Sequence, residues 1–265
     1  NQFDKCVECT VEHSAFNKLP PIAAAVSVGA LANYYDLPLF PWGMVTSRDL
    51  EDNSRFPPVS TLTPGTYAMG VAIHAMMIKF GWKQFGFLYS NYGDDQKCST
   101  TYQDLQSAIA DFDDVQISIA LLLNDVTPKG LGESLQQAKL RERVFVVCLS
   151  DAINLKRSFM LAASDNGMLD NEYVWIFEDT RSRGFVTLTN GVADSMWVDQ
   201  VPPSDGRDQE ALLAFQRVQM LTDVPITLTG DNYTQFGQEV ISRMKEAPFF
   251  CTTECEGADN QVVRK

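Results

Sequence analysis

A short apolar run, Phe85 to Tyr89, limits how this chain can fold more than any other feature. The segment before it, Tyr67 to Phe80, is apolar on nearly every face and predicts a buried helix that Gly81 ends. An apolar run of strand length without alternation is typical of a central parallel strand covered on both faces. The polar loop Ser90 to Asp95 follows the strand. Since ligands bind outside the carboxyl ends of strands in open α/β sheets, we expect this loop on the ligand side.

The same alternation of apolar runs and helical segments continues along the chain. Tyr102, Leu105, Ile109 and Phe112, for example, have the spacing of one helix face. We predict strands at residues 37–40, 59–62, 85–89, 115–123, 144–149, 173–177 and, interrupted, 185–198, and helices at 22–35, 67–80, 102–112, 131–138, 155–162, 211–221 and 233–245. Residues 202–208 are predicted to be a linker. Strands that alternate with helices indicate an α/β architecture with parallel sheets flanked by helices.

Composition excludes several classes of partner. The formal net charge of −13 argues against nucleic acid and against an anionic membrane surface. No run of about 18 apolar residues is present, so we expect no membrane-spanning segment in this chain. The first residues, Asn1 to Lys5, do not begin a basic region followed by an apolar stretch, and we expect no signal peptide there.

The motifs of catalysis and of cofactor binding are missing. Neither phosphate-binding glycine motif, Gly-x-Gly-x-x-Gly or Gly-x-x-x-x-Gly-Lys-Ser/Thr, occurs, and no Gly-x-Ser-x-Gly motif is present. Gly130-Leu131-Gly132 lacks the remaining residues of a phosphate-binding motif. His74 lies inside an apolar helix and is interpreted as a core histidine, while His13 has no identifiable partner. We therefore expect this chain to have no enzymatic activity, no cofactor and no metal.

The cysteines and one glycosylation motif bear on whether the chain is secreted or stays inside the cell. The even count of six cysteines is compatible with disulfides, whereas Cys6-x-x-Cys9 has the spacing of zinc ligands without a matching second pair. Asn232-Tyr233-Thr234 could carry a glycan if the chain is secreted. The residues alone leave these alternatives open.

Several segments resemble one known family. Residues 80–83, running into 85–89, are similar to the phenylalanine–glycine–tryptophan segment of the receptor-family ligand-binding region, a two-lobe ectodomain of the type I periplasmic-binding-protein kind. Lys97-Cys98, residues 143–148 and residues 160–175 resemble the natriuretic-peptide-receptor branch. Residues 38–43, 55–57 and 248–251 look most like the sensory receptor-type guanylate cyclases of roundworms. The resemblance covers roughly residues 21–255.

The resemblance implies an organisation in two lobes. Residues 1–62 would be part of lobe 1, residues 63–200 lobe 2, and residues 201–265 a return segment with a cysteine-bearing tail. The family's opening strand and helix have no counterpart here, and its glycine–proline–x–cysteine turn appears only as residues 6–9, so a chloride site like that of the natriuretic branch is not expected. The chain would then be a fragment that ends before the membrane helix and the cyclase domain.

The resemblance also implies a function. The chain would be the extracellular region of a receptor guanylate cyclase that binds a peptide or a small molecule, works as a homodimer, and signals through cGMP made by another domain. One alternative is a clearance receptor or a seven-helix receptor of the same fold. Another is a cytosolic α/β enzyme with six reduced thiols.

Particular residues follow from this reading. The family implies a disulfide between Cys98 and Cys148. Cys251 and Cys255 are expected to pair with each other or with partners in parts of the protein outside this chain. The ligand-facing loops at the carboxyl ends of the strands are expected to contain Trp42, Thr46, Ser90, Asn91, Tyr92, Glu178 and Asp179. Two alternatives stay open. In one, Trp42 packs under its own loop, and Glu178 and Asp179 are simply solvated. In the other, a peptide binds between two protomers and does not contact most of these residues.

Overall fold

The computed structural model describes residues 21–41, 48–61, 65–93, 97–179, 185–189, 192–222, 238–239, 242–247 and 250. The chain divides into two compact units, Asn1–Asp223 and Val224–Lys265. The first unit contains both sheets and the candidate site.

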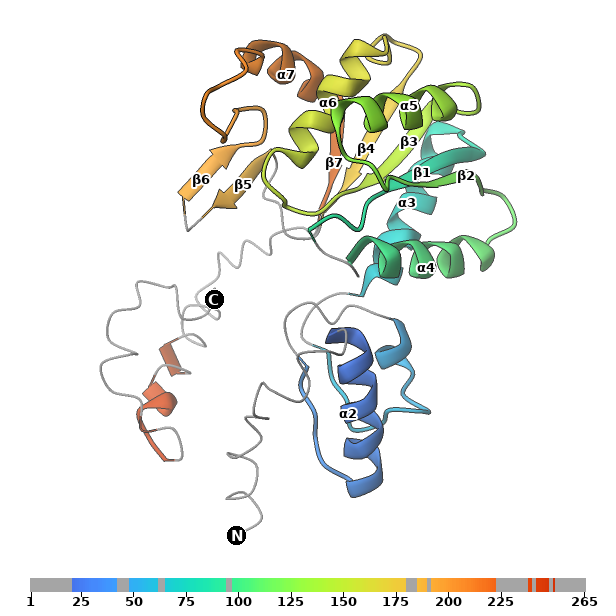
Figure 1. Cartoon of the computed structure of the whole chain (residues 1–265). Coiled ribbons are helices and arrows are strands. Elements are labelled where there is room, and N and C mark those ends of the chain that lie inside the picture. Colours follow the sequence, from blue (N-terminus) through green and yellow to red (C-terminus); the bar gives the residue numbers. More distant parts are fainter. Residues whose placement is uncertain are drawn as a thin grey trace. The chain divides into compact units, whose positions relative to one another are not determined.

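A parallel five-stranded sheet, in the order β2-β1-β3-β4-β7, forms the centre of the unit (Figure 1). Its strands are β1 (Gln84–Tyr89), β2 (Gln116–Leu122), β3 (Val144–Cys148), β4 (Val174–Glu178) and β7 (Val218–Leu221). A separate antiparallel pair joins β5 (Val186–Thr189) to β6 (Val192–Ser195). The prediction of a parallel α/β architecture is confirmed.

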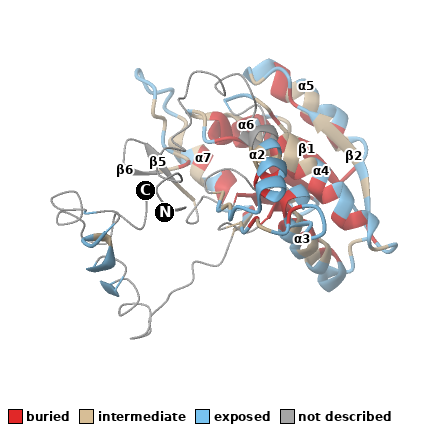
Figure 2. Ribbon diagram, turned by 90° about the horizontal axis from the view of Figure 1, so that it is seen from below, coloured by how far each residue is buried: buried red, intermediate tan, exposed pale blue. Residues whose placement is uncertain are grey.

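Helices cover both faces of the sheet: α3 (Thr66–Phe80), α4 (Lys97–Ala110), α5 (Pro128–Lys139), α6 (Leu155–Asp165) and α7 (Asp208–Phe215). Helix α2 (Pro21–Tyr35) and the 3-10 helix η2 (Arg48–Glu51) instead belong to a separate small cluster around Leu50, Phe56 and Val59. One buried cluster joins the sheet to α3 and α4, and another joins its opposite face to α5, α6 and α7. Figures 1 and 2 show these layers, with buried residues where helices and sheet meet.

Strand β1 is an interior strand, as its apolar run predicts. Phe85 and Phe87 belong to the cluster with α3 and α4, and Leu88 belongs to the cluster on the other face. Gly86 leaves room for a neighbouring ring, because a Cβ there would lie 2.9 Å from Cδ1 of Phe145. Every residue from Phe85 to Leu88 is buried, so this strand anchors both halves of the core.

Helix α3 fits the prediction only in part. It ends at Gly81, whose φ of 72° is a left-handed conformation that favours glycine, and the N–H of Gly81 donates to the carbonyl of Ile78. Only one face of the helix is buried, however, and Ile78 and Phe80 are about half exposed. Apolar composition alone therefore overstated its burial.

Two further expectations about secondary structure were wrong. The helix predicted for residues 211–221 ends at Phe215, and Val218–Leu221 instead forms β7, which pairs with β4. The sheet therefore extends to Leu221. The strands expected at residues 37–40 and 59–62 amount to a single parallel bridge between Leu39 and Val59.

The linker predicted at residues 202–208 is held by one buried arginine. Arg157, on α6, donates two hydrogen bonds to the carboxylate of Asp205, at 2.7 and 2.6 Å, and one to Asp208 at 2.8 Å. Its Nε donates to the carbonyl of Trp197 at 3.0 Å. The guanidinium thus joins the segment between β6 and α7 to the core.

Arg157→Met is expected to lower the free energy of unfolding by about 2 kcal/mol. The Arg157 side chain is only 3% exposed, but its two carboxylate partners are about 40% exposed, so solvation of those groups reduces the loss. Urea denaturation measures the change. Lys129→Met is the control, since the pair between Lys129 and Glu133 is open to water, and it should cost well under 1 kcal/mol. Equal losses in the two variants would contradict the anchoring role.

Acid should weaken the same anchor. Hydrogen bonds from Arg157 lower the pKa of Asp205 from 3.8 to about 2. Because the folded pKa is depressed, the stabilisation is present above the unfolded value and is lost as the pH falls from about 4 through 2. Arg157→Met should flatten the stability profile in that range.

Candidate functional site

The strand order reverses between β1 and β3, because β2 lies on one side of β1 and the later strands lie on the other. In open α/β sheets, ligands bind outside the carboxyl ends of the strands at such a switch point. Two loops meet there: residues 90–93, after β1, and residues 149–153, after β3. The predicted ligand-side loop is the first of them.

Two serine hydroxyls hold the backbone of Tyr92. Its N–H donates to Oγ of Ser90 at 3.1 Å, and its carbonyl accepts a hydrogen bond from Oγ of Ser150 at 2.5 Å. Gly93, with a φ of 80°, packs so closely that a Cβ there would lie 2.9 Å from Oγ of Ser150. The side chain of Tyr92 is nevertheless 58% exposed. The result is a fixed loop that presents an aromatic ring to solvent.

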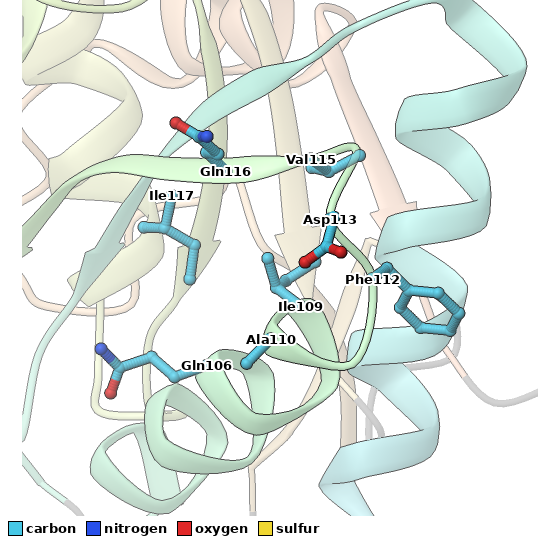
Figure 3. Close-up of a pocket in the computed structure, with 8 residues that line it drawn as sticks. All are labelled: Gln106, Ile109, Ala110, Phe112, Asp113, Val115, Gln116 and Ile117. Atoms are coloured by element: carbon cyan, nitrogen blue, oxygen red, sulfur yellow. The ribbon is translucent and has the colours of Figure 1, made fainter.

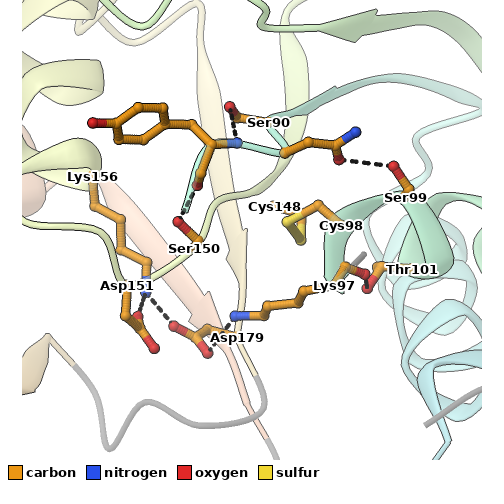
Figure 4. Close-up of a disulfide and its surroundings, with 12 residues drawn as sticks. Ser90, Lys97, Cys98, Ser99, Thr101, Cys148, Ser150, Asp151, Lys156 and Asp179 are labelled. Atoms are coloured by element: carbon orange, nitrogen blue, oxygen red, sulfur yellow. Dashed lines mark hydrogen bonds and ion pairs between the residues drawn. A yellow bond between two sulfur atoms is a disulfide. The ribbon is translucent and has the colours of Figure 1, made fainter. Parts of the chain in front are cut away.

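A buried charge cluster lies behind these loops (Figure 4). Asp179 follows β4, is fully buried, and accepts hydrogen bonds from Nζ of Lys97, at 3.2 Å, and from Nζ of Lys156. Lys156 also donates to Asp151 at 2.6 Å. Burial favours the neutral form of Lys156, but the charges of Asp179 and Asp151 outweigh it and raise its pKa. The cluster therefore ties the first residue of α4 to α6 and to the loops after β3 and β4.

A disulfide joins the same elements. Cys98, in the first turn of α4, is bonded to Cys148, the last residue of β3, with 5.5 Å between the Cα atoms (Figure 4). This is the pair that the resemblance implies. Ser99, next in the helix, donates from Oγ to the side-chain oxygen of Asn91 at 2.8 Å. The start of α4 is thus fastened to β3 by a covalent bond and to the β1 loop by a hydrogen bond.

The structure separates the residues predicted to face a ligand into two groups. Tyr92 is exposed and Asn91 is half-buried. Ser90, Glu178 and Asp179 are buried, so in this structure they support loops, and ligand contact by them stays a prediction. Trp42, Thr46, Asn232, Cys251 and Cys255 lie outside the described residues.

Four residues of this site were missed by sequence reasoning: Lys97, Ser150, Asp151 and Lys156. A signal existed for Ser150 and Asp151, because they follow the predicted strand 144–149 in the same way that Glu178 and Asp179 follow theirs. No signal marked the lysines, since a lysine in a helix is ordinarily exposed.

The described residues contain neither a candidate metal site nor a candidate membrane-spanning helix. No three or more histidine, cysteine or acidic side chains in that part of the chain are grouped as they would be around a metal ion. None of the described helices combines the length and the apolar character needed to cross a bilayer.

Comparison with known proteins gives a consistent picture. Residues 22–249 match the family model described as "Receptor family ligand binding region". Among curated proteins, the chain is 35% identical over 275 residues to receptor-type guanylate cyclase gcy-7 of Caenorhabditis elegans, covering 99% of this chain and 25% of that protein. It is 39% identical to gcy-6 and 35% identical to gcy-13 of the same organism, covering 91% and 90% of this chain and 22% and 23% of those proteins. The chain thus spans about a quarter of the length of these relatives.

Proposed function

Because this chain belongs to the receptor family ligand binding region, we propose that it is the extracellular, ligand-sensing part of a receptor guanylate cyclase. The family match over residues 22–249 carries the proposal of a ligand-binding region. The proposal of a cyclase domain elsewhere in the protein rests on the relatives, which are named as receptor-type guanylate cyclases. The ligand is a peptide or a small molecule. Binding changes the relative orientation of two lobes. This shifts the equilibrium between two conformations of the receptor, and the shift alters the activity of a cyclase domain elsewhere in the full protein.

The buried disulfide supports an extracellular location. Disulfides persist in secreted and cell-surface proteins and are rare in the cytosol. Cys98 and Cys148 are bonded and fully buried, an arrangement that disfavours the alternative of a cytosolic enzyme with six reduced thiols. The same proposal includes a homodimer, a glycan on Asn232 and the division into residues 1–62, 63–200 and 201–265.

We propose that Tyr92 contacts the ligand and that Ser90 and Ser150 position it. A rigid, exposed aromatic ring offers contact area at a small cost in conformational entropy. The hydrogen bonds of both serines fix the Tyr92 backbone before any ligand arrives. Asn91, beside it, adds a polar group that Ser99 orients. Trp42 and Thr46 are the proposed contacts from lobe 1.

The full-length protein that contains this chain provides the test. We expect cGMP to rise in cells that express it when peptides, amino acids and other small molecules are screened as stimuli. With an active stimulus in hand, Tyr92→Ala should raise the half-maximal dose about tenfold. Phe80→Ala, which removes an exposed ring on α3, should leave the dose unchanged.

Each failure has a distinct meaning. Saturable ligand binding without any cGMP response would favour the clearance or seven-helix receptor. A normal cGMP response that Tyr92→Ala does not alter would remove Tyr92 from the site but keep the receptor assignment, and binding between two protomers would then be the better account.

A further inference from the structure

Strand β2 forms one border of the large sheet, beside β1 (Figure 1). Within the described part of the chain it pairs with β1 alone. The N–H of Leu123 donates to the carbonyl of Tyr89, so the two-residue alternation of a strand turns the N–H groups of Ala120 and Leu122 to the outer side. An outer row of this kind can pair with one more strand.

The usual protection of an edge strand is present only at the start of β2. The register shifts there by one residue, and Oγ of Ser118 donates to the carbonyl of Phe85 at 3.1 Å, which marks a bulge. Beyond the bulge, Ile119 to Leu122 pair regularly with Gly86 to Tyr89. No charged residue and no proline lies between Gln116 and Leu122. The second half of the strand is therefore an uncharged edge that no other described strand covers.

A shallow pocket of about 420 Å³, largely open to solvent, lies at the amino end of this edge, between β2 and the end of α4. Figure 3 shows Ile109 and Ile117 facing each other across it, with Gln106 and Asp113 at its two ends. Ile109 is buried, whereas Asp113 and Gln106 are exposed. Such a surface fits a long cationic side chain, whose stem can lie on the isoleucines while its head pairs with the carboxylate of Asp113.

Charge decides which occupant fits the edge. Asp113 and Asp114 precede β2, Asp125 follows it, and all three are exposed. A second copy of the chain, paired edge to edge in either direction, would bring acidic groups together, which is unfavourable. A partner with basic residues around an uncharged centre would meet opposite charges at both ends.

We propose that the outer edge of β2 and the pocket beside it bind an extended, basic segment of a partner protein as an added strand. Backbone hydrogen bonds to Ala120 and to the N–H of Leu122 hold the segment, while the carbonyl of Leu122 accepts a hydrogen bond from Asn124. A lysine or arginine of the segment fills the pocket against Asp113. Addition of a strand to a sheet edge is a known mode of peptide recognition. The pocket lies at the amino end of β2, at the opposite end of the strand from the ligand loops, and the inference does not depend on the proposed function.

The test uses the 265-residue chain and a synthetic peptide of alternating threonine and valine with a lysine at each end. We expect saturable binding by fluorescence anisotropy and slower hydrogen exchange at the Ala120 amide by NMR. Asp113→Lys should weaken binding about three- to tenfold, because it replaces an attraction by a repulsion. Glu133→Lys, an equal change of charge on the exposed face of α5, should leave binding unchanged.

A second peptide separates strand addition from charge attraction alone. The same sequence with proline at its centre keeps both lysines but cannot complete the ladder, and it should bind much more weakly. Equal binding of the two peptides, or binding that leaves the Ala120 amide unprotected, would overturn the proposal. A protected Ala120 amide in a peptide-free dimer of the chain would overturn it in favour of a second copy.

Discussion

Asp179→Asn is expected to lower the free energy of unfolding by about 3–5 kcal/mol, because it leaves buried ammonium groups without their shared carboxylate. Asp179 is fully buried, and the side chains of its partners Lys97 and Lys156 are only 7% and 5% exposed. The substitution keeps the shape of the side chain, so the loss reports charge rather than packing. Urea denaturation followed by circular dichroism measures it.

Asp151→Asn is the matched control. Asp151 pairs with the same Lys156, but its side chain is 40% exposed, so water can take its place and the loss should be about 1 kcal/mol or less. The raised pKa of Lys156 adds a check at high pH. Its stabilisation is fully present below the unfolded value of 10.5 and is lost as the pH rises through the folded pKa. Similar small losses in both variants would show that Asp179 is not the centre of the cluster.

Replacing both Cys98 and Cys148 by alanine is expected to cost about 4 kcal/mol, because the bond closes a loop across a sequence separation of 50 residues. In the chain-entropy model, the cross-link acts chiefly by restricting the unfolded chain. The double variant should therefore unfold at a lower urea concentration while keeping its native circular dichroism spectrum.

Peptide mapping of the non-reduced protein provides the direct check of this disulfide. Both sulfurs are buried, and neither residue should react with an alkylating agent in the native state. Recovery of either cysteine as an alkylated free thiol would contradict the pairing, and the predicted loss of stability would fall with it.

The strands of the central sheet were predictable for a physical reason. A strand covered on both faces must be apolar throughout, and β1 and β3 show this pattern in the sequence. Strand β7 was missed because Val218–Leu221 borders the sheet within the described residues and is only half-buried, so its conformation depends on pairing with β4. Pairing across such a distance leaves no periodic signal in the local sequence.

The position of the site was also predictable, but the roles of its residues were not. Strand ends place residues 90–92 and 178–179 at one edge of the sheet. Whether an acid there meets solvent or a lysine depends on which helix lies opposite. Asp179 meets Lys97 from α4 and Lys156 from α6, and no spacing in the sequence relates these three residues.

The late position of β7 has a consequence for how the chain is made. During synthesis, β1, β2, β3 and β4 emerge before β7, and both partners of the Cys98–Cys148 bond emerge before it as well. The edge of β4 stays open until Leu221 has emerged. Open edges invite wrong pairing between chains, so a nascent chain that pauses before Val218 is at risk of aggregation. A truncated version of this protein should therefore retain Leu221.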